Sequence, residues 1–311
     1  MRYPVPKCLA ARHRLALEGM MNLKNINKKR IVIKLGGSAL DQPATLKELA
    51  KLVKGYQERN YDVVVVHGGG PAINQELVKR NISWKFIDGQ RQTTPEMMNV
   101  IEKVLAGDVN QKVVGSLRGN GIPAVGLSGG QDRILICVPA ADSRLMRVGT
   151  VETVNTHAIE VVLKYSGGNV VPVIAPIGIG NFGNKFNVNA DWAATQIATE
   201  LKAEKLVFLT DQFGILNADQ ELIKVAPPRL LERMMLEGVI YGGMSTKVRA
   251  MVLAINKGIK QVQVLHATTA SLLLDDETTG TVIMKIPAIR TTRKEVVHAR
   301  SSRAERNTRA S

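Results

Sequence analysis

The chain has 311 residues, of which 45% are hydrophobic, and this composition supports one large or two modest domains while excluding a chain that is disordered throughout. Its formal net charge of +15 lies mostly at the ends, because residues 1–30 contribute +7 and residues 286–311 contribute +5, which leaves about +3 for the body. A near-neutral body with 4% aromatic residues argues against a fold built to bind a specific nucleic acid.

The two basic ends are predicted to be solvated extensions, an N-terminal one over residues 1–30 and a disordered tail over residues 286–311. The two cysteines, Cys8 and Cys137, are too few for a disulfide framework or a zinc site, which favours a reducing compartment. Arginines interrupt the first apolar stretch, and no run reaches the roughly 20 apolar residues of a membrane helix. We therefore expect a cytoplasmic protein without a membrane partner. An organellar leader is the alternative for the arginine-rich start.

The first recognisable unit is a strand, a helix and a second strand. Residues 31–33 and 63–66 are short runs of β-branched residues, typical of strands buried on both faces of a parallel sheet. Between them, residues 46–53 have the apolar spacing of a helix, and Pro43 suits its start. Each strand ends in a glycine-rich turn, at residues 34–38 and 67–71. Because ligands bind beyond the carboxyl ends of such strands, the turns are predicted to form a cradle for phosphate and an acyl substrate.

The remaining elements alternate between helices and buried strands. The predicted helices cover residues 72–80, 95–105 and 109–117, and the predicted strands cover residues 124–127, 134–138, 170–175, 206–210, 261–265 and 281–284. Residues 148–168 are predicted to be a connection and a helix that ends at a glycine pair. Pro172 indicates that its strand lies near a sheet edge.

Arg91 precedes the helix that Thr94 is predicted to cap and Pro95 to begin. A guanidinium in a turn near the glycine cradle suits the bidentate binding of a carboxylate. A solvated surface arginine is the alternative, and the segment alone does not decide between them.

Residues 178–183 match the GxGxxG pattern of a dinucleotide site. The helix that such a site requires does not follow, because residues 185–188 have an extended pattern, so we reject that interpretation. Asn187, Asn189 and Asp191 then crowd the start of an alanine-rich helix, where a capping role explains only one of the three.

The turn after the next predicted strand suits a nucleotide. Residues 211–216 form a turn after a predicted strand, at the carboxyl edge of the sheet. Residues 242–247 open a helix whose apolar face contains Val248, Val252 and Ile255. Lys247 is thus a second lysine near a glycine-rich helix start.

Taken in order, these motifs resemble those of the acetylglutamate kinases of the amino acid kinase family, over residues 30–285. They are KLGG at residues 34–37, HGGGP at 67–71, GQRQT at 89–93, NVNAD at 187–191, TDQFG at 210–214 and GGMSTK at 242–247. The resemblance implies an α/β fold, an open three-layer αβα sandwich with a mostly parallel central sheet. It also implies a kinase domain over residues 31–285, in which residues 31–185 bind the acylamino acid and residues 186–285 bind the nucleotide.

The implied reaction transfers the γ-phosphoryl group of ATP to the side-chain carboxylate of N-acetyl-L-glutamate, the second step of arginine biosynthesis. By resemblance, the catalytic residues are Lys34, Lys247 and Asp191, of which the aspartate holds both lysines in place. The implied substrate-binding residues are Gly69, Gly70, Arg91 and Asn187, and the phosphate-binding ones are Gly36, Gly37 and Gly68. The implied nucleotide-binding residues are Asp211, Gly214, Ile215, Leu216, Tyr241 and Gly243. Mg²⁺ is expected to arrive with ATP, without a metal site of the protein's own.

The chain departs from the usual family pattern at Gln90, which replaces a leucine, and at Thr94, which replaces an acidic residue. The resemblance implies a homodimer. A hexamer is the alternative, because some members link dimers through an N-terminal helix and residues 7–20 occupy the corresponding stretch. The sequence also leaves open a related kinase that acts on glutamate, aspartate, carbamate or UMP, and a non-catalytic binding protein.

The residue chemistry agrees with the implied reaction. A carboxylate with a pKa near 4.3 is already ionised at neutral pH, so the acceptor needs no general base. The difficulty is electrostatic, because an anion must attack an anionic phosphoryl group. The two lysines and Mg²⁺ supply the positive charge that offsets this repulsion.

Deleting residues 287–311 should leave folding and activity intact, because this polar, basic segment has no periodic apolar face that could join a core. The melting temperature and the phosphoryl-transfer rate of the full-length and truncated chains measure this. Any RNA binding through the tail should weaken as salt rises. Earlier melting or lost transfer in the truncated chain would show that the tail belongs to the folded enzyme.

Overall fold

The computed structural model describes residues 28–165 and 169–286. Most of the predicted N-terminal extension, with residues 7–20, and the tail from residue 287 onward lie outside the described residues. The glycine pair that is expected to end a helix, at residues 167–168, lies outside them too.

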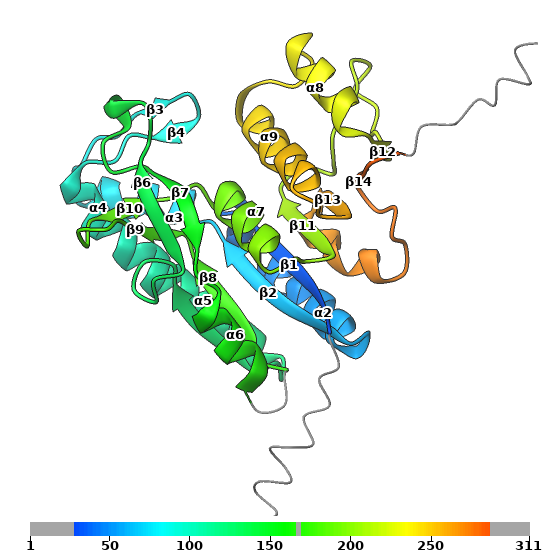
Figure 1. Cartoon of the computed structure of the whole chain (residues 1–311), viewed down its shortest axis with the longest axis horizontal. Coiled ribbons are helices and arrows are strands. Elements are labelled where there is room, and N and C mark those ends of the chain that lie inside the picture. The colour runs from blue at the N-terminus through cyan, green and yellow to red at the C-terminus, as the bar shows by residue number, and fades with distance from the viewer. Residues whose placement is uncertain (1–27, 166–168, 287–311) are drawn as a thin grey trace, which may run out of the picture.

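The molecule is built on an eight-stranded sheet that runs through its middle (Figure 1). Its strands stand in the order β12-β14-β13-β11-β1-β2-β8-β5. Neighbouring strands run parallel, apart from the antiparallel pair β13 and β14. The bounds are β1 Lys29–Leu35, β2 Tyr61–His67, β5 Ala124–Ser128, β8 Val171–Ala175, β11 Lys205–Thr210, β12 Val225–Ala226, β13 Gln261–His266 and β14 Thr281–Ile283. The mostly parallel sheet that the sequence predicts is confirmed.

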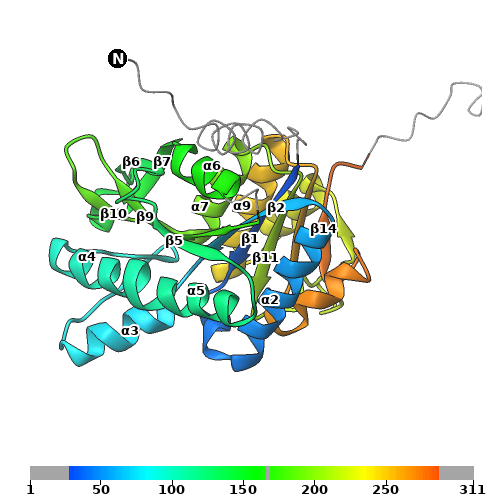
Figure 2. The same ribbon diagram turned by 90° about the horizontal axis from the view of Figure 1, so that it is seen from below.

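Helices cover both faces of the sheet (Figure 2). One face carries α2 (Pro43–Glu58), α3 (Gly70–Lys79), α4 (Pro95–Glu102), the π-helix η2 (Lys103–Val109), α5 (Asn110–Gly119) and the 3₁₀ helix η5 (Ala267–Leu274). The other face carries α6 (His157–Lys164), α7 (Ala190–Glu200), α8 (Pro228–Leu236) and α9 (Gly242–Asn256).

The two hydrophobic cores follow from the alternation of side chains along each strand. In β1, Ile31 and Ile33 pack into the core beneath α2 and α5, whereas Val32 packs into the core beneath α7 and α9. Residues 31–33 of β1 are therefore apolar on both faces, which explains their continuous β-branched sequence. The result is the three-layer αβα sandwich expected from the sequence.

A smaller sheet has the order β10-β9-β6-β7 and lies beside the main one. Its strands are β6 (Leu135–Pro139), β7 (Gly149–Val154), β9 (Ile177–Ile179) and β10 (Lys185–Asn187). The expectation of a connection after residue 148 was wrong in part, because β7 forms there and pairs with β6. The polar residues of β7 hide the apolar alternation that identifies a strand.

Several further sequence patterns take the forms expected of them. The GxGxxG stretch covers the end of β9 and most of the turn to the antiparallel strand β10, so it opens no helix. Thr94 caps α4 by accepting a hydrogen bond from the Met97 amide. Pro172 lies in β8, which is next to the edge strand β5.

Helix α8 was not predicted from the sequence.

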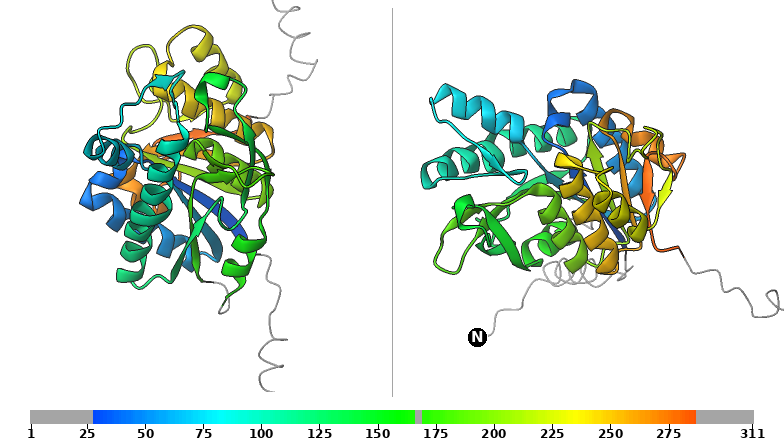
Figure 3. Two further views of the ribbon diagram at one scale, coloured as in Figure 1. Left: turned by 90° about the vertical axis from the view of Figure 1, so that its left-hand side faces the viewer. Right: turned by 90° about the horizontal axis from the view of Figure 1, so that it is seen from above.

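The parallel strands bring the two predicted halves of the chain to one edge of the sheet. Strand β1 lies between β2 and β11, so the turns that follow these three strands are neighbours. In the right-hand view of Figure 3, the cyan and most green segments lie toward one end of the molecule and the yellow and orange segments toward the other. A short hairpin of β3 (Phe86–Ile87) and β4 (Gln90–Arg91) reaches across this edge, where its Gly89 approaches the Thr246 hydroxyl of α9. None of the described helices is long and apolar enough to cross a membrane.

Gly280→Ala should destabilise the protein far more than Gly183→Ala. Both glycines have φ of +78°, which costs a residue with a side chain about 1–2 kcal/mol. A methyl group at residue 280 would in addition lie 2.2 Å from the Val264 carbonyl oxygen, whereas one at residue 183 would meet nothing within 4 Å. Overpacking adds about 1–3 kcal/mol. Urea denaturation of the two variants tests this, and equal losses of unfolding free energy would contradict it.

Candidate active site

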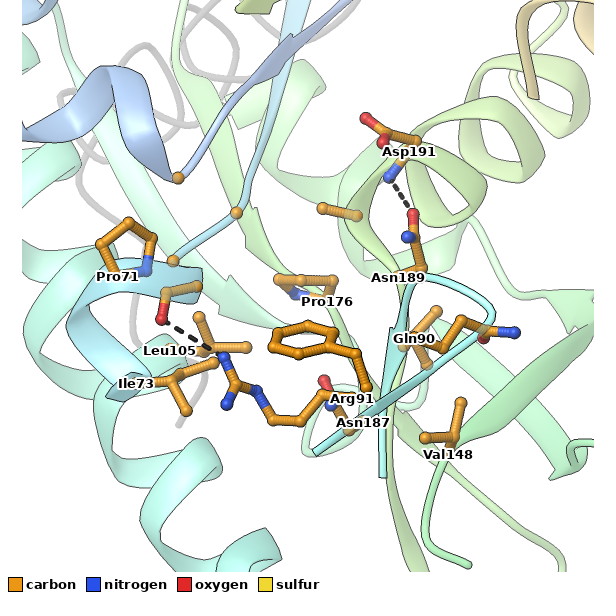
Figure 4. Close-up of a pocket in the computed structure, with 18 of the residues that line it drawn as sticks. Pro71, Ile73, Gln90, Arg91, Leu105, Val148, Pro176, Asn187, Asn189 and Asp191 are labelled. Atoms are coloured by element: carbon orange, nitrogen blue, oxygen red, sulfur yellow. Dashed lines mark hydrogen bonds between the residues drawn. The ribbon is translucent and has the colours of Figure 1, made fainter. Parts of the chain in front are cut away.

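A cavity of about 400 Å³ opens at the carboxyl ends of β1 and β2 (Figure 4). The residues predicted to act in catalysis and substrate binding all line it, together with two of the predicted phosphate-binding glycines. They are Lys34, Lys247, Asp191, Gly69, Gly70, Arg91, Asn187, Gly37 and Gly68. These residues come from β1, the two glycine turns, the β3–β4 hairpin, β10, α7 and α9, so segments far apart in the sequence build one site.

Two lysines share one buried aspartate. The Nζ atom of Lys34 lies 2.6 Å from Oδ1 of Asp191, and the Nζ atom of Lys247 lies 3.8 Å from Oδ2. Lys34 and Asp191 are each 5% exposed. Burial alone raises the pKa of Asp191, but the charges and hydrogen bonds of the two lysines outweigh it and keep the pKa below its ordinary value. The carboxylate therefore stays ionised and leaves the group of three with one net positive charge.

The start of α7 holds this aspartate in place. Asn189 is the N-cap, and its side chain accepts hydrogen bonds from the amides of Asp191 and Trp192. The cap leaves Asn187 and Asp191 free for other roles, which agrees with the excess of polar residues in the sequence there. Figure 4 shows Asn189 next to Asp191 at the rim of the cavity.

The two glycine turns touch each other. A methyl group on Gly37 would lie 2.7 Å from both the Gly69 and the Gly70 amide nitrogens, so only glycine lets these turns approach so closely. The amides of Gly36 and Gly68 donate instead to the carbonyls of Leu209 and Leu35, each at 2.8 Å. The phosphate-binding role expected of Gly36, Gly37 and Gly68 stays a prediction, but the amides of Gly36 and Gly68 are already paired with backbone carbonyls. Gly36 does not line the cavity, and Gly68 lines it without a free amide.

His67 lies directly beneath the second turn and is fully buried. Its Nδ1 atom is 2.9 Å from the Gly68 carbonyl oxygen, and its Nε2 atom is 3.2 Å from the side-chain nitrogen of Asn110. Burial lowers the pKa of His67 to about 4, while the bond to Gly68 opposes the shift. The ring is thus neutral at physiological pH.

Arg91 projects into the cavity and is only 7% exposed (Figure 4). One terminal nitrogen donates to Asn74 and, at 3.5 Å, to the Gly70 carbonyl, while the other is buried without a partner among the described residues. The guanidinium also faces the rings of Phe86 and Trp84, at 4.9 and 5.6 Å. Burial lowers its pKa to about 10, so it is cationic at neutral pH. An unpartnered, charged donor in a cavity suits a carboxylate.

Asn187 lies at the end of β10, on the same wall as Arg91 (Figure 4). Its side-chain nitrogen donates to Thr93 at 3.0 Å, and the Thr93 hydroxyl donates to the Arg91 carbonyl at 2.9 Å. This chain of hydrogen bonds links the orientation of Asn187 to the backbone of Arg91.

A second cavity, of about 420 Å³, lies beside the first. It is lined by all the residues predicted to bind the nucleotide, which are Asp211, Gly214, Ile215, Leu216, Tyr241 and Gly243. Lys247 lines both cavities. A ligand in the second cavity can therefore extend toward the group of two lysines and Asp191.

Sequence reasoning missed several residues of the site. Asn74, Trp84 and Phe86 contact Arg91, and Asn110 contacts His67. Asn74 lies one helical turn after Gly70 in α3, so its spacing from the glycine turn could have predicted that it faces the cavity. The aromatic residues lie in a loop without periodicity, and only the tertiary fold brings Asn110 to His67.

The described part of the chain contains no group of three or more histidine, cysteine or acidic residues that could hold a metal. Asp191 is already occupied by two lysines. The expectation that Mg²⁺ arrives with a nucleotide stays a prediction.

The sequence model of the amino acid kinase family matches residues 29–266. An acetylglutamate kinase from Geobacillus kaustophilus (strain HTA426) is 40% identical over 243 residues, which cover 78% of this chain and 91% of that protein. An acetylglutamate kinase from Aquifex aeolicus (strain VF5) is 38% identical over 275 residues, which cover 83% of this chain and 91% of that protein.

Solved structures share the fold. The crystal structure of smu.665 from Streptococcus mutans UA159 superposes with a TM-score of 0.72 at 27% identity. The match covers 83% of this chain and 99% of that structure. The architecture is therefore common to both chains over almost the whole of that structure.

Between pH 7 and pH 5, the unfolding free energy of the wild-type protein should fall more than the unfolding free energy of the His67→Asn variant. The unfolded histidine, with a pKa near 6.5, takes up a proton in this range, whereas the folded one does so only near its pKa of about 4. The unfolded state then binds more protons, so acid lowers the unfolding free energy. The extra loss is about 2 kcal/mol. Urea denaturation at both pH values measures it, and parallel losses would contradict a buried, neutral His67.

Proposed function

The chain belongs to the amino acid kinase family, and on that premise we propose that it is an acetylglutamate kinase. It transfers the γ-phosphoryl group of ATP to the side-chain carboxylate of N-acetyl-L-glutamate, giving N-acetyl-L-glutamyl 5-phosphate and ADP. This is the second step of arginine biosynthesis. The main support for this reaction is the pair of lysines that share Asp191. All three residues line the cavity of the buried Arg91, and Lys247 also lines the second cavity.

The acceptor binds in the first cavity through its α-carboxylate. Arg91 has an unpartnered nitrogen there, and its position over Phe86 and beside Asn74 limits its motion. Asn187 supplies an amide on the same wall. A substrate held at this end directs its side chain toward the glycine turns.

The nucleotide binds in the second cavity, bordered by the loop after β11 and the start of α9. Its phosphates extend past Lys247 toward Gly37, Gly69 and Gly70. The first half of the chain thus serves the acceptor and the second half the nucleotide.

Transfer needs no proton movement. A carboxylate oxygen of the acceptor attacks the γ-phosphorus, and the bond from phosphorus to the β,γ-bridging oxygen breaks, so that ADP leaves with the electron pair. Lys34 and Lys247 neutralise the charge on the oxygens of the transferred group. The Gly69 and Gly70 amides, which lie beside Gly37, donate hydrogen bonds to the same oxygens. Mg²⁺ on the nucleotide would add positive charge at the β- and γ-phosphates.

Asp191 holds both lysines in place and cancels only part of their charge, so one net positive charge remains for the phosphoryl group. Two ammonium groups alone would repel each other, and one carboxylate between them removes most of that cost. Because the ion pairs hold the three groups together, little reorganisation accompanies the reaction.

A screen of acceptors tests the proposed function. With ATP and Mg²⁺, N-acetyl-L-glutamate should be turned over far better than glutamate, aspartate, carbamate or UMP. Trapping with hydroxylamine detects the acyl phosphate as a hydroxamate. Preferred turnover of another acceptor would identify a related kinase instead.

The enzyme acts in the cytoplasm as a homodimer, with a hexamer as the alternative assembly. Gel filtration with light scattering, with and without arginine, separates these states. A monomer in both conditions would overturn the proposed assembly but not the proposed reaction.

Lys34→Ala and Lys247→Ala should each lower kcat about 10²- to 10³-fold, the typical cost of losing one preorganised donor. The KM values should change much less, because the lysine charges matter most in the transition state. Lys257→Ala, which removes a surface lysine just after α9, is the matched control. Either active-site variant keeping more than about half the wild-type kcat would remove that lysine from the mechanism.

Arg91→Lys should raise the KM for N-acetyl-L-glutamate on the order of tenfold or more, because lysine keeps the charge but loses the planar fork. The KM for ATP should stay nearly constant, since Arg91 does not line the second cavity. Steady-state kinetics with each substrate varied in turn measures both values. An unchanged acceptor KM, or an equal loss for ATP, would exclude Arg91 from the acceptor site.

A further inference from the structure

The imidazole of His67 is held in one tautomer by two neighbours. The Asn110 side-chain nitrogen lies 2.9 Å from the Val173 carbonyl oxygen. A carbonyl oxygen accepts hydrogen bonds only from donors, so the side-chain nitrogen of Asn110, and not its oxygen, must face Val173. The same nitrogen is 3.2 Å from His67 Nε2, so it donates and Nε2 accepts. The proton is then on Nδ1, which donates to the Gly68 carbonyl at 2.9 Å.

Asn110 owes its position to an irregular helix. It is the first residue of α5 and directly follows the π-helix η2. The backbone of β5 makes room for its side chain, because a methyl group on Gly126 would lie 2.0 Å from the Asn110 Oδ1 atom. π-Helical segments are rare and are frequently found at functional sites.

The same π-helix contacts the glycine turn from a second direction. The Leu105 side chain, which lines the cavity, would lie 2.5 Å from a methyl group on Gly69, and that of Val109 would lie 3.4 Å from it. Asn110, through His67, thus fixes the carbonyl of Gly68, while Leu105 packs against the next residue.

We propose that His67 and Asn110 are positioning residues that hold the Gly68 carbonyl away from the cavity, so that the Gly69 and Gly70 amides face the transferred phosphoryl group. This inference rests on the proposed phosphoryl transfer. The peptide that joins Gly68 to Gly69 has its carbonyl at one end and the Gly69 amide at the other, so fixing the first directs the second. Glycine residues alone would leave this peptide free to rotate.

Loss of the His67 donor should therefore lower kcat and leave substrate binding nearly unchanged. The Arg91 and nucleotide contacts do not involve His67, whereas the amides act on charge that develops in the transition state. A residue that only stabilised the fold would lower the fraction of active enzyme and would not weaken one class of ligand selectively.

Two variants of similar size separate the roles. His67→Asn keeps an N–H near the place of Nδ1, and His67→Leu has none. His67→Leu should lose about 10- to 100-fold in kcat with both KM values within about threefold of wild type. His67→Asn should recover most of that loss. The inhibition constant for ADP with aluminium fluoride, a mimic of the transferred group, should rise in His67→Leu, whereas that for AMP-PNP should not.

Asn110→Ala provides a second variant if His67→Leu fails to fold. It keeps the His67 donor but frees the ring to rotate, so kcat should again fall while the KM values change little. Equal losses in His67→Asn and His67→Leu, or KM increases that match the kcat losses, would overturn the positioning role.

A measurement without substrate separates this inference from the proposed function. In ¹⁵N NMR of the labelled protein, the His67 ring should show a protonated Nδ1 and an unprotonated Nε2. The opposite tautomer would overturn the positioning role even in an active enzyme. Conversely, a wild-type protein that fails to phosphorylate N-acetyl-L-glutamate would refute the proposed function, while the tautomer would still report on the support of the glycine turn.

Discussion

The site depends on one buried carboxylate that carries two lysines. Lys34 and Lys247 approach one another around Asp191, which supplies the counter-charge from the first turn of a helix capped by Asn189. An unpaired charge so deeply buried would be expensive, which makes the three residues interdependent. Asp191 therefore joins α7 to both lysine-bearing elements, β1 and α9.

Strand order explains how that unit is assembled. β1 stands at the centre of the sheet with β2 on one side and β11 on the other, so the turns that carry Gly37, Gly69 and Asp211 share one edge. The two hydrophobic cores pack on the two faces of the sheet, and residues of the smaller sheet and of the β3–β4 hairpin line the cavity that contains Arg91. The residues of the cavity thus lie at the ends of strands and helices and in the turns between them, and the packing of the layers sets the distances between these residues.

Much of this could be predicted from the sequence, for identifiable reasons. Buried parallel strands have continuous β-branched runs, and glycine turns that follow such strands are typical of anion-binding loops. Strand β7 escaped because its polar residues break the alternation, and the hydrogen bonds of the Gly36 and Gly68 amides depend on neighbouring strands that sequence spacing does not reveal. The contact between Asn110 and His67 escaped because it depends on an irregular helix turn. Local rules therefore identify the charged residues of the site and miss their supports.

The most direct measurement is a crystal structure of the protein with ADP, Mg²⁺, aluminium fluoride and N-acetyl-L-glutamate. The aluminium fluoride should lie within hydrogen-bond distance of Lys34, Lys247 and the Gly69 and Gly70 amides. The acceptor's α-carboxylate should lie on Arg91, and its side-chain carboxylate should stand in line with the ADP oxygen. A planar fluoride group bound away from either lysine, or an acceptor bound outside the cavity of Arg91, would contradict a reaction centred on the two lysines and Asp191.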